Sequence, residues 1–266
     1  MNIGRSRHFV APLVMLSLYA ASGAAVAGTI PPCNGNCTWS VAENGQQVLS
    51  GGYSLDSSGS IIDITGATRG TLSDGNSVWI SSLSGNADPI LGFNLGAGTG
   101  ATGSSFTFTF NLPISIAGPI DASSSVSYSL TALSSAGAQV SPLLGSHIII
   151  AQEVDTTVGG LPPLNKGVDV GNSFAVAGGP QTGNSLVYTM YNFLNGNLAY
   201  DLMSVTAAFT LSPNSQVGMS GFVQQIPTPV PLPGAAWLML CGLCGVGALT
   251  RSRGRPFWSG RAATPA

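Results

Sequence analysis

Hydrophobic and polar residues alternate along much of the chain. The stretches SSFTFTFNL (104–112) and SSVSYSLTAL (124–133) each place a hydroxyl side chain between successive apolar ones. A period of two puts the apolar side chains of each stretch on one face of a β-strand. These apolar residues are Phe106, Phe108 and Phe110 in the first stretch, and Val126, Tyr128 and Leu130 in the second.

The same reasoning predicts ten further strands, separated in part by turn-forming pairs. The expected strands are Thr38–Ala42, Gln47–Ser50, Ile61–Thr65, Ser77–Leu83, Ile90–Leu95, His147–Glu153, Ser173–Ala177, Leu186–Phe193, Met203–Leu211 and Gln216–Gln225. The turn signals are Asn44-Gly45, Asp74-Gly75 and Pro213-Asn214. Glycine, proline, asparagine and aspartate at such positions favour tight turns. Two polar stretches, 96–105 and 156–167, are expected to be long loops.

Many short strands, each with one apolar face, must bury those faces against a second sheet. We therefore expect residues 28–226 to form one all-β domain, a β-sandwich with a jelly-roll-like arrangement. These 199 residues are enough for a sizeable core. No internal repeat and no helix-period segment is apparent between the two ends of the chain.

The N-terminal segment, residues 1–27, is typical of a secretory signal peptide. Arg5, Arg7 and His8 precede an apolar run, and Ala25 and Ala27 place small residues where a signal peptidase cleaves. A buried N-terminal helix is the alternative, but it accounts for neither the flanking charges nor the small residues.

An uncharged run of 19 residues, Pro231–Leu249, lies near the C-terminus. As a helix it reaches ~28 Å, close to the hydrocarbon thickness of a bilayer. We expect a transmembrane helix over 233–249, because proline is tolerated in a first helical turn. A packed core helix is the alternative.

The basic residues after this run are Arg251, Arg253 and Arg255. Positive charge beside a transmembrane helix favours the cytoplasmic side. The expected topology leaves residues 28–229 outside the cytoplasm and residues 256–266 as a cytoplasmic tail.

The segment 227–255 resembles the C-terminal sorting segment of PEP-CTERM proteins. Val230, Pro231, Leu232 and Pro233 are similar to a variant of the family's proline motif, followed by the apolar helix and the arginines. The resemblance implies processing by an exosortase, in Gram-negative bacteria that make exopolysaccharide. It also implies that the inner membrane is a transient anchor. Leu232 replaces the acidic residue of the usual motif, and 11 residues follow Arg255. A plain C-terminal anchor is the alternative.

Charge and cysteine content indicate which partners and which compartment suit the expected domain. All ten carboxylates lie between residues 28 and 226, with only Arg69 and Lys166 as cations, which gives a formal charge of −8. The absence of a basic patch argues against nucleic acid as a partner. Cys33 and Cys37 bracket a turn-prone triplet and are expected to form a disulfide, which suits an exported protein.

No constellation of residues supports catalysis, so we expect a protein that is not an enzyme and has no cofactor or metal. His147, the only histidine of the mature domain, lies in an expected strand, where a structural role is favoured over that of a catalytic base. Paired carboxylates can hydrolyse glycosides or bind calcium, and two pairs are candidates, although the spacing of the second does not match the EF-hand pattern. The pairs are Glu153 with Asp155 and Asp56 with Asp63. A solvated charge in a loop or at a strand end is the alternative for each pair.

Two classes of function remain open. The first is an exported, non-enzymatic surface or matrix protein, structural or adhesive, with extracellular polysaccharide as an expected partner. The second is a carbohydrate-binding or carbohydrate-active sandwich, which needs exposed aromatic residues on one sheet. The candidates for sugar stacking are Trp39, Tyr53, Trp79, Tyr188 and Tyr191, although core packing is expected for most of them.

Overall fold

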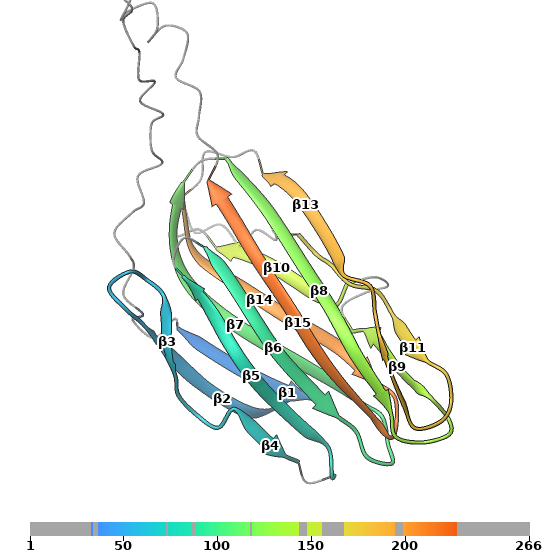
Figure 1. Cartoon of the computed structure of the whole chain (residues 1–266). Coiled ribbons are helices and arrows are strands. Elements are labelled where there is room, and N and C mark those ends of the chain that lie inside the picture. The colour runs from blue at the N-terminus through green and yellow to red at the C-terminus, as the bar shows by residue number, and fades with distance from the viewer. Residues whose placement is uncertain are drawn as a thin grey trace, which may run out of the picture.

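The computed structural model describes residues 33, 37–72, 74–86, 89–117, 119–143, 148–155, 168–194 and 199–227. Within these residues the chain forms β-strands and their connections (Figure 1). The strands are β1 (Thr38–Glu43), β2 (Gln46–Leu55), β3 (Ile61–Ile64), β4 (Arg69–Thr71), β5 (Ser77–Asn86), β6 (Ile90–Gly98), β7 (Ser104–Ala117), β8 (Ile120–Ala132), β9 (Ala138–Pro142), β10 (Ile150–Asp155), β11 (Phe174–Val176), β12 (Gln181–Asn184), β13 (Tyr188–Leu194), β14 (Ala199–Leu211) and β15 (Ser215–Pro227).

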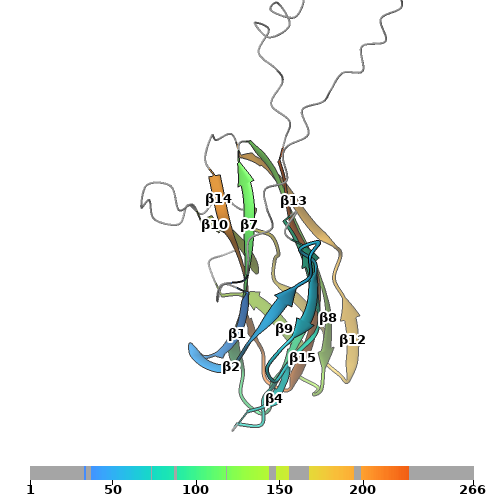
Figure 2. The same ribbon diagram turned by 90° about the vertical axis from the view of Figure 1, so that its left-hand side faces the viewer.

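The strands form two antiparallel sheets that pack face to face, as Figure 2 shows from the side. The eight-stranded sheet has the order β11-β9-β14-β7-β1-β2-β3, and β10 also pairs with β14. The seven-stranded sheet has the order β12-β8-β15-β6-β5-β4, and β13 also pairs with β8. The predicted all-β sandwich is therefore confirmed.

One continuous hydrophobic core lies between the two sheets. Phe93 of β6 stacks on Phe110 of β7 with ring centroids 5.7 Å apart, which joins the sheets at their centre. Phe108 stacks in turn on Phe209 of β14, with centroids 6.1 Å apart. Phe106, Phe108 and Phe110 of the first alternating stretch are buried, as are Val126, Tyr128 and Leu130 of the second. Removal of this surface from water is the main force that holds the sheets together.

The three predicted turn signals lie in turns between strands. Asn44 and Gly45 connect β1 to β2, and both have positive φ, 49° and 78°. This combination is typical of the tight type I′ turn of a two-residue hairpin, for which Asn-Gly is the preferred pair. Gly75 and Asn214 also have positive φ, 84° and 50°.

The prediction of a long loop over residues 96–105 is wrong. β6 continues to Gly98 and β7 begins at Ser104, so only residues 99–103 connect them. The composition is misleading because side chains of the neighbouring strand occupy the space above the glycines of β6, as described below. β10 begins at Ile150 and extends to Asp155, later than predicted, and β4, β9 and β12 were not predicted.

Several predictions concern residues outside the described part of the chain. They are the signal peptide (1–27) with Ala25 and Ala27, the loop 156–167, His147, and the sorting segment with Val230, Pro231, Leu232, Pro233, Arg251, Arg253 and Arg255. Among the residues that are described, no helix is long and apolar enough to span a membrane.

Candidate functional site

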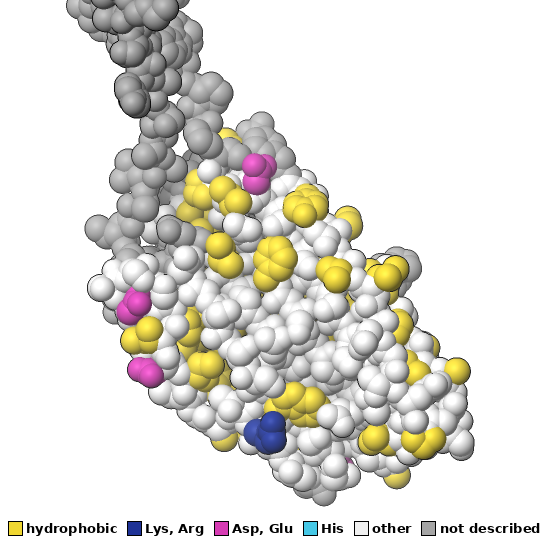
Figure 3. Space-filling model, viewed as in Figure 1, with side chains coloured by type: hydrophobic (Ala, Val, Ile, Leu, Met, Phe, Trp, Pro, Cys, Tyr) yellow, Lys and Arg dark blue, Asp and Glu magenta, His cyan; other side chains and the backbone are white. Residues whose placement is uncertain are grey.

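The outer face of the seven-stranded sheet is polar but almost free of charge. Inward positions of its four central strands are mainly apolar and buried, whereas outward positions carry mainly hydroxyl, amide or glycine residues. The outward residues are Ser123, Ser125, Ser127, Ser129 and Thr131 on β8, Gln216, Gly218, Ser220, Phe222 and Gln224 on β15, Gly92, Asn94, Gly96 and Gly98 on β6, and Ser77, Trp79, Ser82 and Ser84 on β5. Figure 3 shows this face as a broad area without charged side chains, which lie at its margins.

One row of directly paired residues crosses five strands of this face. It runs Trp79–Gly96–Gly218–Ser129–Asn184, from β5 through β6, β15 and β8 to β12. Directly opposed residues of antiparallel strands have their side chains on the same face. We call this row the glycine rung, because the two glycines leave its middle without side chains.

The indole of Trp79 covers Gly96. A Cβ at Gly96 would lie only 2.2 Å from Cζ2 of Trp79, so the ring occupies the space of the missing side chain. The position above Gly218, in contrast, is open, since a Cβ there would meet no atom within 4 Å. The rung therefore consists of a half-buried aromatic ring, a gap over Gly218, and then Ser129 and Asn184.

The next row along the strands is a chain of polar side chains, Ser82–Asn94–Ser220–Ser127. Asn94 Nδ2 donates to Ser82 Oγ at 2.6 Å, and Asn94 Oδ1 accepts a hydrogen bond from the Ser220 hydroxyl. These hydrogen bonds join β5, β6 and β15 on their outer side. They hold the amide of Asn94 in one orientation beside the gap over Gly218.

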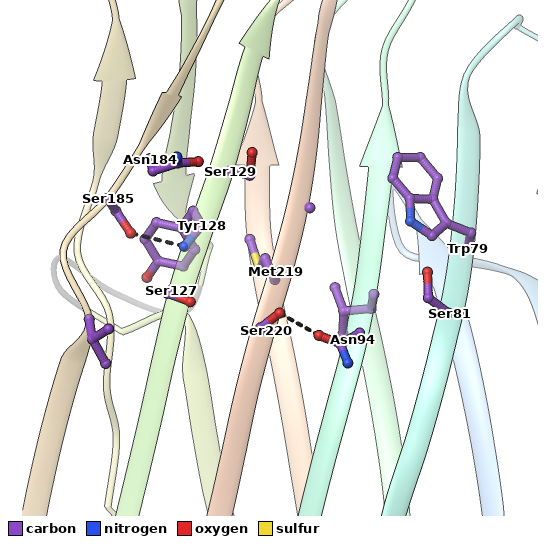
Figure 4. Close-up of a pocket in the computed structure, with 13 residues that line it drawn as sticks. Trp79, Ser81, Asn94, Ser127, Tyr128, Ser129, Asn184, Ser185, Met219 and Ser220 are labelled. Atoms are coloured by element: carbon purple, nitrogen blue, oxygen red, sulfur yellow. Dashed lines mark hydrogen bonds between the residues drawn. The ribbon is translucent and has the colours of Figure 1, made fainter.

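The two rows form a trough of about 450 Å³ on the outer face (Figure 4). This volume lies within the ~300–1,000 Å³ typical of small-molecule sites. Ser127, Ser129 and Asn184 line the trough, and their side chains form no hydrogen bond with the described part of the protein. In Figure 4 the Trp79 ring is seen broadside at one end, with Asn184 and Ser185 at the other.

Little charge lies near the trough. The described residues that line it include no carboxylate and no cation. Arg69 of β4 pairs directly with Trp79 and is exposed, so its side chain lies beside the trough on the same face. Asp121 lies at the far end of β8, where it pairs with Ile226.

A second group of exposed side chains lies at that far end. Tyr191 of β13 is 76% exposed and pairs with Ser123, and Phe222 and Ile226 of β15 are also exposed. Tyr191 and Ile226 line a separate hollow with Asp121. Of the five aromatic candidates, Trp79 and Tyr191 are thus the two on this outer face.

The other three aromatic candidates pack in the interior. Trp39 is buried and donates from Nε1 to the Thr65 carbonyl at 3.1 Å. Tyr53 is buried, its hydroxyl donates to the Asn111 carbonyl, and burial raises the pKa of this phenol. Tyr188 is half-buried against Tyr128, with ring centroids 5.6 Å apart. A role in sugar stacking for these three residues is therefore not supported by their positions.

The carboxylates Asp56 and Asp63 are not among the residues that line the trough. Asp56 caps its own turn, because Oδ1 accepts from the Ser58 hydroxyl at 2.6 Å and from the Ser60 backbone nitrogen at 2.9 Å. These hydrogen bonds lower the pKa of Asp56. Asp63 of β3 accepts a long hydrogen bond, 3.4 Å, from the hydroxyl of Ser54 on β2, and both strands belong to the eight-stranded sheet. The backbone of β10 includes Glu153 and Asp155, but their side chains lie outside the described part.

The predicted disulfide between Cys33 and Cys37 is confirmed. Cys37 is buried in the core immediately before β1, so the disulfide joins the start of the described chain to the sandwich. Elsewhere, the described residues contain no group of three or more His, Cys, Asp or Glu side chains that suits a metal ion.

Sequence reasoning identified Trp79 as an aromatic candidate but missed the rest of the trough. Asn94, Ser127, Ser129, Asn184 and Gly218 come from four strands that are distant in the sequence. The available signal was the outward serines of the stretch 123–131, which alternate with buried residues. Nothing in the sequence indicated which strands lie beside them.

Fold and site together define an antiparallel β-sandwich with an uncharged trough on the outer face of one sheet. No family model and no curated protein matches the chain. Two solved structures are similar in part. The enzymatically active domain of tailspike protein 4 of bacteriophage CBA120 is 9% identical with a TM-score of 0.28, and the match covers 71% of this chain and 19% of that one.

The second structure is TmCBM61 in complex with β-1,4-galactotriose. It is 9% identical with a TM-score of 0.24, and the match covers 71% of this chain and 88% of that one. The present chain spans about a fifth of the tailspike chain. Similarities at this level assign neither a family nor an activity to the protein.

Proposed function

We propose that this protein is a jelly-roll-like β-sandwich that is exported and acts at the cell surface or in the extracellular matrix. Its role is adhesive and non-enzymatic, and its partner is extracellular polysaccharide. Residues 1–27 direct export, and residues 227–255 anchor the precursor in the inner membrane until an exosortase processes it. The processed domain then stays outside the cytoplasm.

The outer face of the seven-stranded sheet is the observation that carries the adhesive role. It presents rows of hydroxyl and amide groups, an exposed Tyr191 and a half-buried Trp79, with almost no charge. Polysaccharides offer many hydroxyl groups and ring faces made of C–H groups. A surface that combines hydrogen-bonding groups with aromatic rings matches both properties.

Carbohydrate binding without hydrolysis fits the described side chains better than glycosidase activity. A glycosidase needs two carboxyl groups on either side of the bond, about 5–10 Å apart. Within the described part of the chain no carboxylate lines the trough, while Asp56 is engaged in its own turn and Asp121 lies at the far end of the face. A lectin-like role is therefore preferred.

The sorting step is tested with the double variant Pro231→Ala/Pro233→Ala, expressed as the full chain in a strain that has its exosortase. We expect the unprocessed precursor to accumulate in the membrane fraction, as judged by its size on immunoblots. Pro256→Ala, beyond the arginines, is the matched control and should be processed normally. Unchanged size and location of the double variant would contradict the sorting proposal.

The adhesive role is tested by the distribution of the exported protein between the matrix and the medium. We expect the protein in the polysaccharide fraction of cells that produce exopolysaccharide, and in the medium of a mutant that produces none. Equal retention in both strains would show that polysaccharide is not the partner.

A further inference from the structure

We propose that the trough beside Trp79 is a binding site for an uncharged glycan, with one sugar ring stacked on the indole and the chain running across the strands to Ser129 and Asn184. This inference rests on the proposed adhesive function, which it deepens by naming the site and the class of sugar. It is independent of the sorting segment.

The position of Trp79 provides a stacking surface that is already in place before binding. Gly96 allows the indole to lie against the backbone of β6, and a Cβ at Gly96 would also lie 2.5 Å from the Val217 carbonyl oxygen. One side of the ring is thus supported by the sheet, and the half-buried Trp79 lines the trough. A ring held in this way loses little conformational freedom when a ligand stacks on it.

Gly218 makes room for the ligand next to this ring. Trp79 and Ser129 belong to the same rung, and Gly218 is the direct neighbour of Ser129 in it. Gly218 has no side chain, and a Cβ there would meet no atom within 4 Å. Neighbouring strands are about 4.8 Å apart, so the rung from Gly96 to Asn184 spans about 14 Å. An elongated ligand that lies across the strands therefore contacts both ends of the trough.

The polar groups of the trough match sugar hydroxyl groups. Asn94 is oriented by its hydrogen bonds to Ser82 and Ser220, and Ser127, Ser129 and Asn184 have free donors and acceptors toward the trough. Hydroxyl and amide groups both donate and accept hydrogen bonds, as sugar hydroxyls do. The trough thus offers neutral hydrogen-bonding partners rather than charged ones.

Other ligand classes fit this trough less well. Phosphate-rich ligands need several cations, but the described residues contain a single Lys or Arg, the exposed Arg69. A peptide strand adds to an unpaired sheet edge, but β6, β15 and β8 are paired on both sides over the trough. A lipid chain needs a mainly apolar cavity, and most side chains of the trough are polar.

The decisive variant is Gly218→Val in the full chain, purified in mild detergent. The new side chain fills the trough but meets no atom of the protein within 4 Å at its Cβ, so the variant is expected to fold. Thr109→Val is the matched control, because it introduces a valine on the outer face of the other sheet, on a central strand and away from the trough. Thermal unfolding of each variant verifies its folding independently of binding.

Binding is measured on an array of neutral and acidic glycans, followed by titration with the strongest neutral ligand. We expect the wild type and Thr109→Val to bind neutral glycans, and Gly218→Val and Trp79→Ala to bind at least about tenfold more weakly. EDTA should leave binding unchanged, because none of the described residues that line the trough is a carboxylate. Arg69→Gln should change it by less than about twofold, as a peripheral charge contributes little to a neutral ligand.

Several outcomes would overturn the inference. They are the absence of binding to every neutral glycan, full binding by Gly218→Val, loss of binding in EDTA, or acidic glycans bound in an Arg69-dependent manner. If the purified protein binds neutral glycans through the trough but is not retained in the matrix of living cells, the site is correct and the adhesive function is wrong. Matrix retention that Gly218→Val leaves intact would instead place the adhesive contact elsewhere.

Discussion

Asn76 Nδ2 donates a hydrogen bond of 2.5 Å to Oε1 of Glu43, and both residues are buried. Glu43 ends β1 in one sheet, whereas Asn76 lies just before β5 in the other. The same carboxylate oxygen accepts from the Ser104 hydroxyl at 2.7 Å, and Asn76 Oδ1 accepts from the Gly100 backbone nitrogen at 2.8 Å. This network joins both sheets at the end of the sandwich where the hairpin turns lie.

Replacement of Asn76 is expected to destabilise the fold. Asn76→Ala removes one donor to the buried carboxylate of Glu43, and a buried polar group that loses its partner costs about 1–3 kcal/mol. Asn76→Asp should cost more, because it brings a further carboxylate next to Glu43 and Asp74. Urea unfolding measures both effects. The exposed Asn192→Ala is the control, and equal stability of all three variants would show that the network contributes nothing.

The two outward glycines of the glycine rung are expected to respond in opposite ways to alanine. Gly96→Ala forces Trp79 out of its place and should destabilise the protein by about 1–3 kcal/mol, the usual cost of overpacking. Gly218→Ala meets no atom, has no positive φ, and should be neutral or stabilising by up to about 1 kcal/mol. Denaturant unfolding with tryptophan fluorescence reports stability and the environment of Trp79 together. A similar effect at both glycines would contradict the position of the indole.

The disulfide is expected to add to stability although it closes a short loop. Cys33 and Cys37 are four positions apart, for which loop-closure entropy gives about 2 kcal/mol. Cys33→Ser opens the loop and leaves the buried Cys37 in place. We expect Cys33→Ser to lower the free energy of unfolding by about 2 kcal/mol, measured under non-reducing conditions. A reductant should destabilise the wild type and leave Cys33→Ser unaffected, whereas an unchanged wild type would show that the loop contributes no stability.

The turn after β2 is expected to make stability depend on pH in the acidic range. The hydrogen bond from the Ser58 hydroxyl, with a smaller effect of the Ser60 backbone, holds the pKa of Asp56 below its ordinary value of 3.8. A carboxyl with a lower pKa in the folded state stabilises the fold above the pKa of the unfolded chain. This contribution is lost as the pH falls through the lower, folded-state value.

NMR titration of the Asp56 carboxyl measures this pKa directly. Ser58→Ala should raise it toward the ordinary value, because the largest stabilising hydrogen bond is removed. Ser57→Ala is the matched control, since the neighbouring Ser57 is exposed and makes no such hydrogen bond to Asp56. An Asp56 pKa that is the same in Ser58→Ala and in the wild type would show that the turn hydrogen bonds do not act on this group.

Local patterns predicted the strands whose sequence alternates regularly. Phe106, Phe108 and Phe110 are all buried on one face of β7, as a period of two requires. The pair Asn44-Gly45 likewise predicted its turn, because positive φ at both positions is accessible to these residues at low cost. Both signals depend only on neighbours along the chain.

The misjudged segments are those in which a partner strand determines the structure. Glycine has a low strand propensity, yet Gly96 and Gly98 belong to β6 because the side chains of Trp79 and Ser77 fill the space above them. β12 has only four residues, QTGN, and exists through its pairing with β8. Strand propensity reflects such packing as much as the residue itself.

The sequence by itself determined the β-sandwich class, the faces of its regular strands, its hairpin turns and the disulfide, because each of these follows from residues close together in the chain. Only the tertiary structure decided the trough. Trp79, Gly96, Ser129, Asn184 and Gly218 meet because the pairing of five strands places them in one row. That register is fixed because the apolar side chains of all strands must face the core together. A shift by one residue would turn every side chain of a strand to the opposite face.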